Sequence, residues 1–363
     1  MRVSRDDVLS YRVHVQQLDR DTDRAFDDTD ILDLGAQDTG TGGSGWALAL
    51  RGVRFDPRRH FIAWTLRGAP TAYRRSEAAE IAAATAPYDT ADAAKRVLSA
   101  SGPLKAAGVP VRDALALVAA AMHEVATEPT VKGVASTRLT ERLPSAYLRY
   151  CRQCAATHSY EMLFRLSALP AGLELAPDSS PPVLTPIPAW SGPATESPRR
   201  LDPIRACLHL FGPLTPKHVA EYIDAPVKTV LKHWPEDVER VAVAGADTAA
   251  EQRWMLAADV SALKGVSEAH DVRLLGSHDL FLQARDHHLL VPDAARHRGL
   301  WPTLGRPGAV LRGHEVVGTW RPRSSGSKLG LSVETWADVP QRELEEQAAR
   351  LAEHRGQVFT GFV

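Results

Sequence analysis

The chain has 363 residues, of which 44% are hydrophobic and 24% charged, a composition typical of soluble globular proteins of two or three domains. No run of 18 apolar residues is present, and the first residues, MRVSRDDVLSYRVH, lack an apolar signal core, so we expect neither a membrane span nor export. The formal net charge of −1 excludes a uniformly basic nucleic-acid binder, so any nucleic-acid contact must come from local basic patches.

The low, odd number of cysteines, three in all, argues against a disulfide framework and fits a reducing compartment. We therefore expect a cytoplasmic protein. A Walker-type phosphate loop and a Gly-x-Ser-x-Gly nucleophile elbow are both missing from the sequence, which argues against the nucleotide-binding and hydrolase classes that depend on them.

The N-terminal third mixes helices with a strand. Ser4 is a candidate N-cap with acidic residues in the following turn, which predicts a helix from residue 5. HFIAWTLR, from residue 60, alternates as a strand does, and the alanine-rich segment that follows favours helices broken by proline and glycine. GTGGSG, residues 40–45, is expected to be a flexible loop.

Two features mark the middle of the chain. Residues 178–200 are rich in proline and are predicted to form an extended strap, which Trp190 and interleaved apolar residues indicate lies against a surface. Residues 201–258 then contain three short helices, the second capped by Thr215 and Pro216, and a hairpin turning at Gly245–Asp247. This order is typical of a winged helix, and residues 117–176 show a weaker version of it.

The C-terminal part is rich in strands. A hairpin is predicted around Gly313 in VLRGHEVVGTWRPR, several further strands suggest a small barrel or curled sheet, and PQRELEEQAARLAEHRGQ is predicted to be a closing helix.

Six segments in this order resemble the AlkZ-like family of winged-helix proteins, which includes DNA glycosylases that remove bulky alkylated purines. They are LGAQDTG, FIAWTLRGAP, FGPLTPKHVAEYI, RLLGSHDLFLQARD, LVPD and VLRGHEVVGTWR, and they span nearly the whole chain. The resemblance implies an α+β fold with tandem winged-helix (helix-turn-helix) units and a small C-terminal β-barrel. It also implies a monomer with a concave face for double-stranded DNA, without a cofactor.

The resemblance and the local patterns together predict five segments. They are an N-terminal winged-helix unit with the candidate catalytic motif (1–115), a second winged-helix unit (116–177), the proline-rich strap (178–200), a third winged-helix unit (201–258), and a β-barrel with the C-terminal helix (259–363).

The candidate catalytic residues are Gln37 and Asp38. Glycosylases of the family carry Gln-apolar-Gln or Gln-apolar-Asp at the end of a helix, and the matching residues here are Gly35, Ala36 and Gln37. The resemblance also places a family histidine at Thr71. This chain therefore keeps the second polar residue of the motif and departs from the family at the other two positions.

Removal of a base requires an extruded nucleotide, a stabilised oxocarbenium-like sugar and a positioned water. Gln37 can hold the water or the sugar by hydrogen bonds, and Asp38 can add negative charge. Adjacent residues of a helix point about 100° apart, however, so both cannot face one pocket of a continuous helix. Asp38 before Thr39-Gly40 equally fits a C-terminal turn or cap residue.

Two basic elements are candidates for DNA binding. The third helix of the 201–258 segment contributes Lys228, Thr229 and Lys232, and TWRPRSSGSK contributes a hairpin with Arg321, Arg323 and Lys328. The lysines of the helix alternatively form an ordinary solvated face.

Cys151, Cys154 and His158, in CRQCAATH, follow one another at steps of three and four residues, which would place them on one face of a helix. They could share a zinc ion completed by a distant residue such as His123, but small buried hydrophobes beside a hydrogen-bonded histidine are the preferred interpretation, so no metal is predicted.

Two functional hypotheses follow. The first is a glycosylase that hydrolyses the N-glycosidic bond of alkylated purines in duplex DNA, with Gln37 positioning water or sugar. The second is a noncatalytic winged-helix DNA-binding protein, a regulator or a sensor of damage or of a genotoxin, which Gly35 in the first motif position favours.

Overall fold

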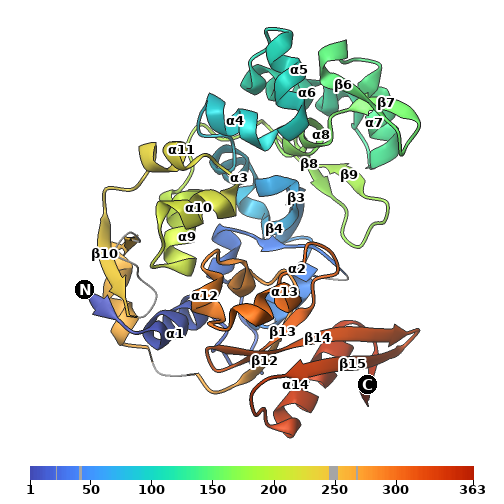
Figure 1. Cartoon of the computed structure of the whole chain (residues 1–363). Coiled ribbons are helices and arrows are strands. Elements are labelled where there is room, and N and C mark those ends of the chain that lie inside the picture. The colour runs from blue at the N-terminus through green and yellow to red at the C-terminus, as the bar shows by residue number, and fades with distance from the viewer. Residues whose placement is uncertain (22, 41–42, 245–251, 267–268) are drawn as a thin grey trace. The chain divides into compact units, whose positions relative to one another are not determined.

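The computed structural model describes residues 1–21, 23–40, 43–244, 252–266 and 269–363 (Figure 1). They divide into two compact units. Unit 1 comprises Met1–Phe55, Arg205–Val219 and Pro235–Val363, and unit 2 comprises Asp56–Ile204 and Ala220–Trp234. The units are therefore interleaved along the chain, and helix α10 begins in one and ends in the other. The five predicted segments follow a different partition and stay a prediction.

The predicted N-terminal helix is confirmed as α1 (Arg5–Val15), and its start is explained by Ser4. The Ser4 hydroxyl accepts a hydrogen bond from the Asp7 amide, and the Asp7 carboxylate accepts one from the Ser4 amide, which forms a capping box. The other helices wholly or mainly in unit 1 are α2 (Gly43–Ala49), α9 (Pro203–Phe211), α12 (His287–Leu290), α13 (His297–Leu300) and α14 (Gln341–His354). Since α2 begins at Gly43, only part of the predicted glycine-rich loop is correct, and residues 41–42 lie outside the described residues.

A curled five-stranded sheet forms the C-terminal part of unit 1, in the order β12-β13-β14-β15-β16 (Figure 1). Its strands are β12 (Val272–Leu275), β13 (Gly308–Arg312), β14 (Glu315–Ser325), β15 (Lys328–Thr335) and β16 (Val358–Phe362). Gly313, with φ of 60°, makes the predicted turn between β13 and β14. Helix α14 packs against β12 and β16. The sheet has two end strands, so the described residues form a half-barrel rather than the closed barrel that was one of the two expectations.

The region of the predicted third winged helix contains the expected elements. Helices α9, α10 (Pro216–Ile223) and α11 (Val227–Lys232) are followed by antiparallel β10 (Val238–Val243) and β11 (Arg253–Leu256), and β1 (Arg2–Val3) pairs in parallel with β10. The Thr215 hydroxyl accepts a hydrogen bond from the His218 amide at 3.1 Å, which confirms the predicted cap. The predicted turn at Gly245–Asp247 lies outside the described residues.

Unit 2 is built on a sheet in which β4, β3, β8, β9 and β5 are neighbours in that order. The strands are β3 (His60–Trp64), β4 (Pro70–Arg74), β5 (Thr130–Val131), β8 (Leu173–Leu175) and β9 (Val183–Pro186). A core of buried side chains that includes Phe61, Tyr73, Ile81 and Leu169 packs on this sheet. The helices of the unit are α3 (Ala78–Ala84), α4 (Thr90–Arg96), α5 (Ser101–Ala106), α6 (Val111–Val125), α7 (Lys132–Thr140), α8 (Glu161–Ala168) and α11.

The proline-rich stretch lies against unit 2, as predicted. Its β9 pairs with β8 and β5, and Trp190 packs on the core. The Trp190 ring is so close to Gly172 that a Cβ there would lie 2.3 Å from it. Gly172 also has φ of 79°, so both the close approach and the backbone conformation require glycine at this position.

The prediction that Cys151, Cys154 and His158 lie on one face of a helix is also wrong. Residues 148–159 form a hairpin of β6 (Leu148–Cys151) and β7 (Ala156–Ser159), not a helix. Among the described residues, none of the helices is both long and apolar enough to cross a bilayer.

Candidate functional site

Gln37 lies in a short strand, not at the end of a helix. A single 3₁₀ turn (Asp30–Asp33) precedes β2 (Ala36–Gln37), in unit 1. Ala36 is buried, and Gln37 is half-buried because its side chain reaches a pocket of this unit.

The amide of Gln37 is held by two side chains. Its Nε2 donates a hydrogen bond to Thr39 Oγ1 at 2.9 Å and lies 3.2 Å from Nδ1 of His278. Because the amide N–H donates in this contact, Nδ1 accepts and the neutral ring carries its proton on Nε2. His278 is 241 residues away in sequence, so the fold brings the pair together. His278 has no distinctive sequence signal of its own, although it lies within RLLGSHDLFLQARD, a segment that carries the family resemblance.

A buried ion pair fixes the segment that carries His278. The neighbouring Asp279 forms two hydrogen bonds with the Arg51 guanidinium, at 2.9 and 3.0 Å, and both side chains are fully buried. Asp279 also accepts a hydrogen bond from the Phe281 amide, and Gln283 donates one to the His278 carbonyl. These bonds position the imidazole beside Gln37.

Asp38 has a different role from its neighbour. Its Oδ1 accepts hydrogen bonds from the backbone amide of Ser44 at 3.0 Å and from the Ser44 hydroxyl at 2.8 Å. The carboxylate thus holds the first turn of α2, at the start of the following helix rather than at the C-terminal end of a preceding one. Successive side chains of an extended segment point to opposite sides, which explains why Gln37 and Asp38 separate.

The pocket that Gln37 lines has a volume of about 450 Å³ and lies entirely within unit 1. The charged residues around it are mainly basic, and the acidic Asp279 is paired with Arg51. The polar and aromatic residues that line it are Gln37, Thr39, Trp46, Ser277, His278, Asp279, Arg306, Trp320, Arg321, Arg323, Ser324 and Arg355. Four guanidinium groups around one cavity favour an anionic ligand.

Two tryptophans give the pocket rigid walls. The indole N–H of Trp46 donates to the Leu274 carbonyl at 2.7 Å, and that of Trp320 donates to the Leu275 carbonyl at 2.9 Å. A Cβ on Gly308 would lie 2.3 Å from the Trp320 ring, so glycine is needed for this packing. Arg355 lies 5.9 Å from the centre of the Trp320 ring, and burial lowers the pKa of Arg355, which a bound anion would offset.

The predicted hairpin cations lie on β14 and β15. Arg321, Arg323 and Lys328 are exposed, and the first two line the pocket. Arg321 donates to the Gly305 carbonyl at 2.6 Å, and residues 321 and 323 share a face of the strand because side chains alternate along it. The structure therefore brings Arg321 and Arg323 together with Gln37.

The predicted helix cations belong to unit 2, on α11. Lys228 and Lys232 are exposed, whereas Thr229 is buried. The Thr229 hydroxyl lies 3.1 and 3.2 Å from the Asp89 carboxylate oxygens, to which it donates. Asp89 caps α4, so Thr229 joins α11 to α4.

Gly35 and Thr71, the two positions that depart from the family pattern, lie in different surroundings. Gly35 is buried with φ of 90°, a conformation that favours glycine. Thr71, in β4 of unit 2, is buried, and its hydroxyl donates to the Ala69 carbonyl at 3.2 Å.

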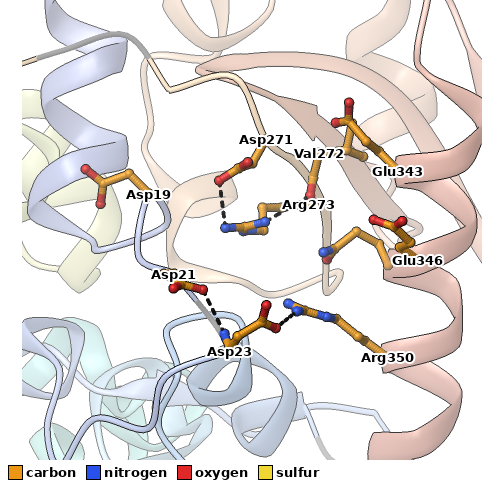
Figure 2. Close-up of a pocket in the computed structure, with 10 residues that line it drawn as sticks. Asp19, Asp21, Asp23, Asp271, Val272, Arg273, Glu343, Glu346 and Arg350 are labelled. Atoms are coloured by element: carbon orange, nitrogen blue, oxygen red, sulfur yellow. Dashed lines mark hydrogen bonds and ion pairs between the residues drawn. The ribbon is translucent and has the colours of Figure 1, made fainter.

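A second pocket of unit 1, about 330 Å³ in volume, has the opposite charge (Figure 2). Six carboxylates and two arginines line it, and Arg273 and Arg350 are paired with Asp271 and Asp23. Excess negative charge repels phosphate, so this pocket is unsuited to a nucleic acid.

Comparisons with known proteins identify the family of the chain. The structure is similar to that of the Streptomyces sahachiroi DNA glycosylase AlkZ, with a TM-score of 0.71 and 17% identity over 100% of both chains. No curated protein sequence matches the chain significantly. Residues 33–354 match the family described as DNA glycosylase AlkZ-like. Because this match covers most of the sequence, the chain belongs to the AlkZ-like DNA glycosylase family.

Proposed function

We propose that the protein hydrolyses the N-glycosidic bond of alkylated purines in duplex DNA, in the pocket of unit 1 that Gln37 lines. The observation that carries this proposal is the Gln37–His278 contact in a cavity surrounded by four arginines. The cavity volume is about 450 Å³, which suits a single extruded nucleotide, and aromatic and basic groups are typical of sites that receive one.

Each group of the pocket has a role in this scheme. Arginines neutralise the phosphates that flank the extruded nucleoside, and the tryptophans supply apolar surface for base or sugar. A purine alkylated at N7 or N3 is cationic, so it departs as a neutral base when its bond to C1′ breaks. Water then adds its oxygen to the oxocarbenium carbon and releases a proton to solvent.

The Gln37 side chain orients the water and the sugar. Its carbonyl oxygen accepts a hydrogen bond from the attacking water, while its N–H groups are held by Thr39 and His278. An amide does not titrate in a useful range, so Gln37 stabilises geometry and charge rather than accepting the proton. Asp38 acts indirectly, because its carboxylate holds the start of α2.

DNA binding extends this proposal beyond the pocket. Arg321, Arg323 and Lys328 of the hairpin, and Lys228 and Lys232 of α11, are proposed to contact phosphates. Thr229, which the sequence predicts as a further DNA contact, is proposed only to position α11 through Asp89. The protein is proposed to act as a cytoplasmic monomer of tandem winged-helix units with the five-segment organisation described above.

The test uses duplex DNA that contains N7-methylguanine or N3-methyladenine. We expect wild type to leave abasic sites, detected as strand breaks after alkali, and Gln37→Ala and His278→Ala to lower the excision rate at least tenfold while they retain DNA binding. Gln341→Ala and His288→Ala, at exposed positions of the same unit, are matched controls that should retain the rate.

Gly35 favours a second candidate function, noncatalytic recognition of damaged DNA. Its φ of 90° shows that the backbone itself departs from what a glutamine at this position would prefer. Binding of alkylated duplex by wild type without release of base would support this function and contradict the first.

A further inference from the structure

The β6–β7 hairpin of unit 2 brings three metal-ligand side chains together. In the register of the hairpin, Cys151 pairs with Ala156 and Arg149 pairs with His158. Side chains of paired residues share a face, so Cys151 and His158 are diagonal neighbours on one face. Cys154 belongs to the connecting turn, and the ligand atoms of the three residues all lie within 4.8 Å of one another.

This arrangement differs from the preferred sequence interpretation of buried small hydrophobes. Cys154 is exposed, and Cys151 and His158 are only half-buried. His123, the suggested distant ligand, is not in the cluster, and its Nδ1 instead lies 2.9 Å from the Ala171 carbonyl.

The turn is shaped around the sulfur of Cys151. The Cys154 backbone amide donates a hydrogen bond to the Cys151 sulfur, and the Cys154 thiol lies within hydrogen-bond distance of it. Ala155 has φ of 49°, a left-handed conformation that a side chain rarely adopts, at the residue that ends this turn.

The histidine is oriented in the same way as many metal ligands. Its Nδ1 lies 2.7 Å from the Ser159 carbonyl, which can only accept, so Nδ1 carries the proton. Nε2 is then the nitrogen with the available lone pair. In metal-bound histidines, a hydrogen bond from the other ring nitrogen to a backbone carbonyl commonly fixes the tautomer and the orientation of the ring.

We propose that Cys151, Cys154 and His158 bind one Zn²⁺ ion, with a water molecule in the fourth position. Two thiolates and an imidazole, with the Cys-x₂-Cys spacing, are a ligand set that zinc prefers, and the exposure of the turn leaves room for water. The ion closes the turn and stabilises the hairpin. This site belongs to unit 2 and does not depend on the proposed glycosylase activity.

The test titrates the reduced, full-length protein with Zn²⁺ against a chromophoric chelator. We expect one equivalent per chain, and at least a tenfold loss of affinity in Cys154→Ser and in His158→Ala. Gln153→Ala is the matched control, because it keeps the backbone amide of the turn and removes no ligand, and it should bind as wild type does. Equal Zn²⁺ affinity in wild type and both ligand variants, or no binding by the reduced wild type, would overturn the proposal.

A second measurement separates metal binding from folding. Zn²⁺ should protect Cys151 and Cys154 from alkylation in the native protein, whereas buried Cys207 reports whether the protein remains folded. Co²⁺ at the same site should give a thiolate-to-metal charge-transfer band that Cys154→Ser weakens. Unchanged alkylation of both thiols in the presence of Zn²⁺ would also contradict the site.

Discussion

Gln37 could be selected from the sequence as a candidate site residue, whereas the side chain that holds it could not. The family resemblance points to Gln37, which lines a pocket with four arginines, but its partner His278 is visible only in the folded chain. A histidine in a loop after a buried strand has no distinctive sequence pattern, and 241 residues separate the pair. Asp38 could be assigned only as one of two alternatives, because its role depends on which way the backbone turns after Gln37.

At Gly35 the backbone conformation predicts an effect on stability. Gly35→Gln, which restores the first residue of the family motif, should lower the free energy of unfolding by about 1–2 kcal/mol, because a side chain at positive φ is strained. Urea denaturation measures this change. Gly133→Gln, at an open position within α7, is the control and should not destabilise. A Gly35→Gln variant as stable as wild type would show that the backbone adapts.

Substitution of Asp286 is expected to lower the free energy of unfolding by more than Gly35→Gln does. Its buried carboxylate binds Arg12 at 2.6 and 3.0 Å and Arg253 at 2.8 Å. Burial raises the pKa of Asp286, but the two guanidinium groups outweigh burial and hold this pKa below its ordinary value. Asp286→Asn leaves two buried cations without their counter-charge and should cost about 3–5 kcal/mol of unfolding free energy in chemical denaturation. The exposed Asp293→Asn is the control, and an equal effect of both would refute a special role for this cluster.

Among the elements, those with local signals were predicted best. The Ser4 capping box, Thr215 before Pro216, and Gly313 in its turn each define an element boundary through nearby residues. The β6–β7 hairpin was missed because the stretch LRYCRQCAATHS lacks apolar alternation, and its cysteines match helical spacing equally well. The half-barrel could not be distinguished from a closed barrel, because strand pairing between distant segments leaves no local pattern.

The β14–β15 hairpin is predicted to contact DNA phosphates through its arginines. Arg321→Ala and Arg323→Ala should each weaken DNA binding and reduce the slope of log affinity against log salt by about 1, because each removes one phosphate contact. Fluorescence anisotropy across a salt series measures both quantities. Lys264→Ala, an exposed position of the same unit, is the control. Salt slopes identical to that of wild type would exclude the hairpin from the DNA interface.

The near-neutral net charge of the whole molecule is an average over a basic and an acidic pocket. One unit contains both the arginine-lined pocket and the acidic pocket of Figure 2. Composition alone therefore understates the capacity for binding polyanions, since it averages over surfaces of opposite sign.

Global stability should also depend on pH through His209. Burial lowers the pKa of His209, but the hydrogen bond and charge of Asp259, 2.9 Å away, outweigh it and raise this pKa above the ordinary value of 6.5. The ion pair therefore stabilises the fold fully below the unfolded-state pKa, and its contribution is lost as pH rises through the higher folded-state pKa. The difference in unfolding free energy between wild type and His209→Gln should shrink from about pH 6 to pH 9. A difference that is constant over this range would contradict the pairing.

The interleaving of the two units has a consequence for dissecting the molecule. The backbone passes from one unit to the other four times, after Phe55, Ile204, Val219 and Trp234. A protease that cuts once, or a premature stop codon, consequently always yields fragments in which at least one unit lacks a strand or a helix. Isolation of either unit would require circular permutation or linkers that join its separate segments, so simple truncation is expected to give insoluble products.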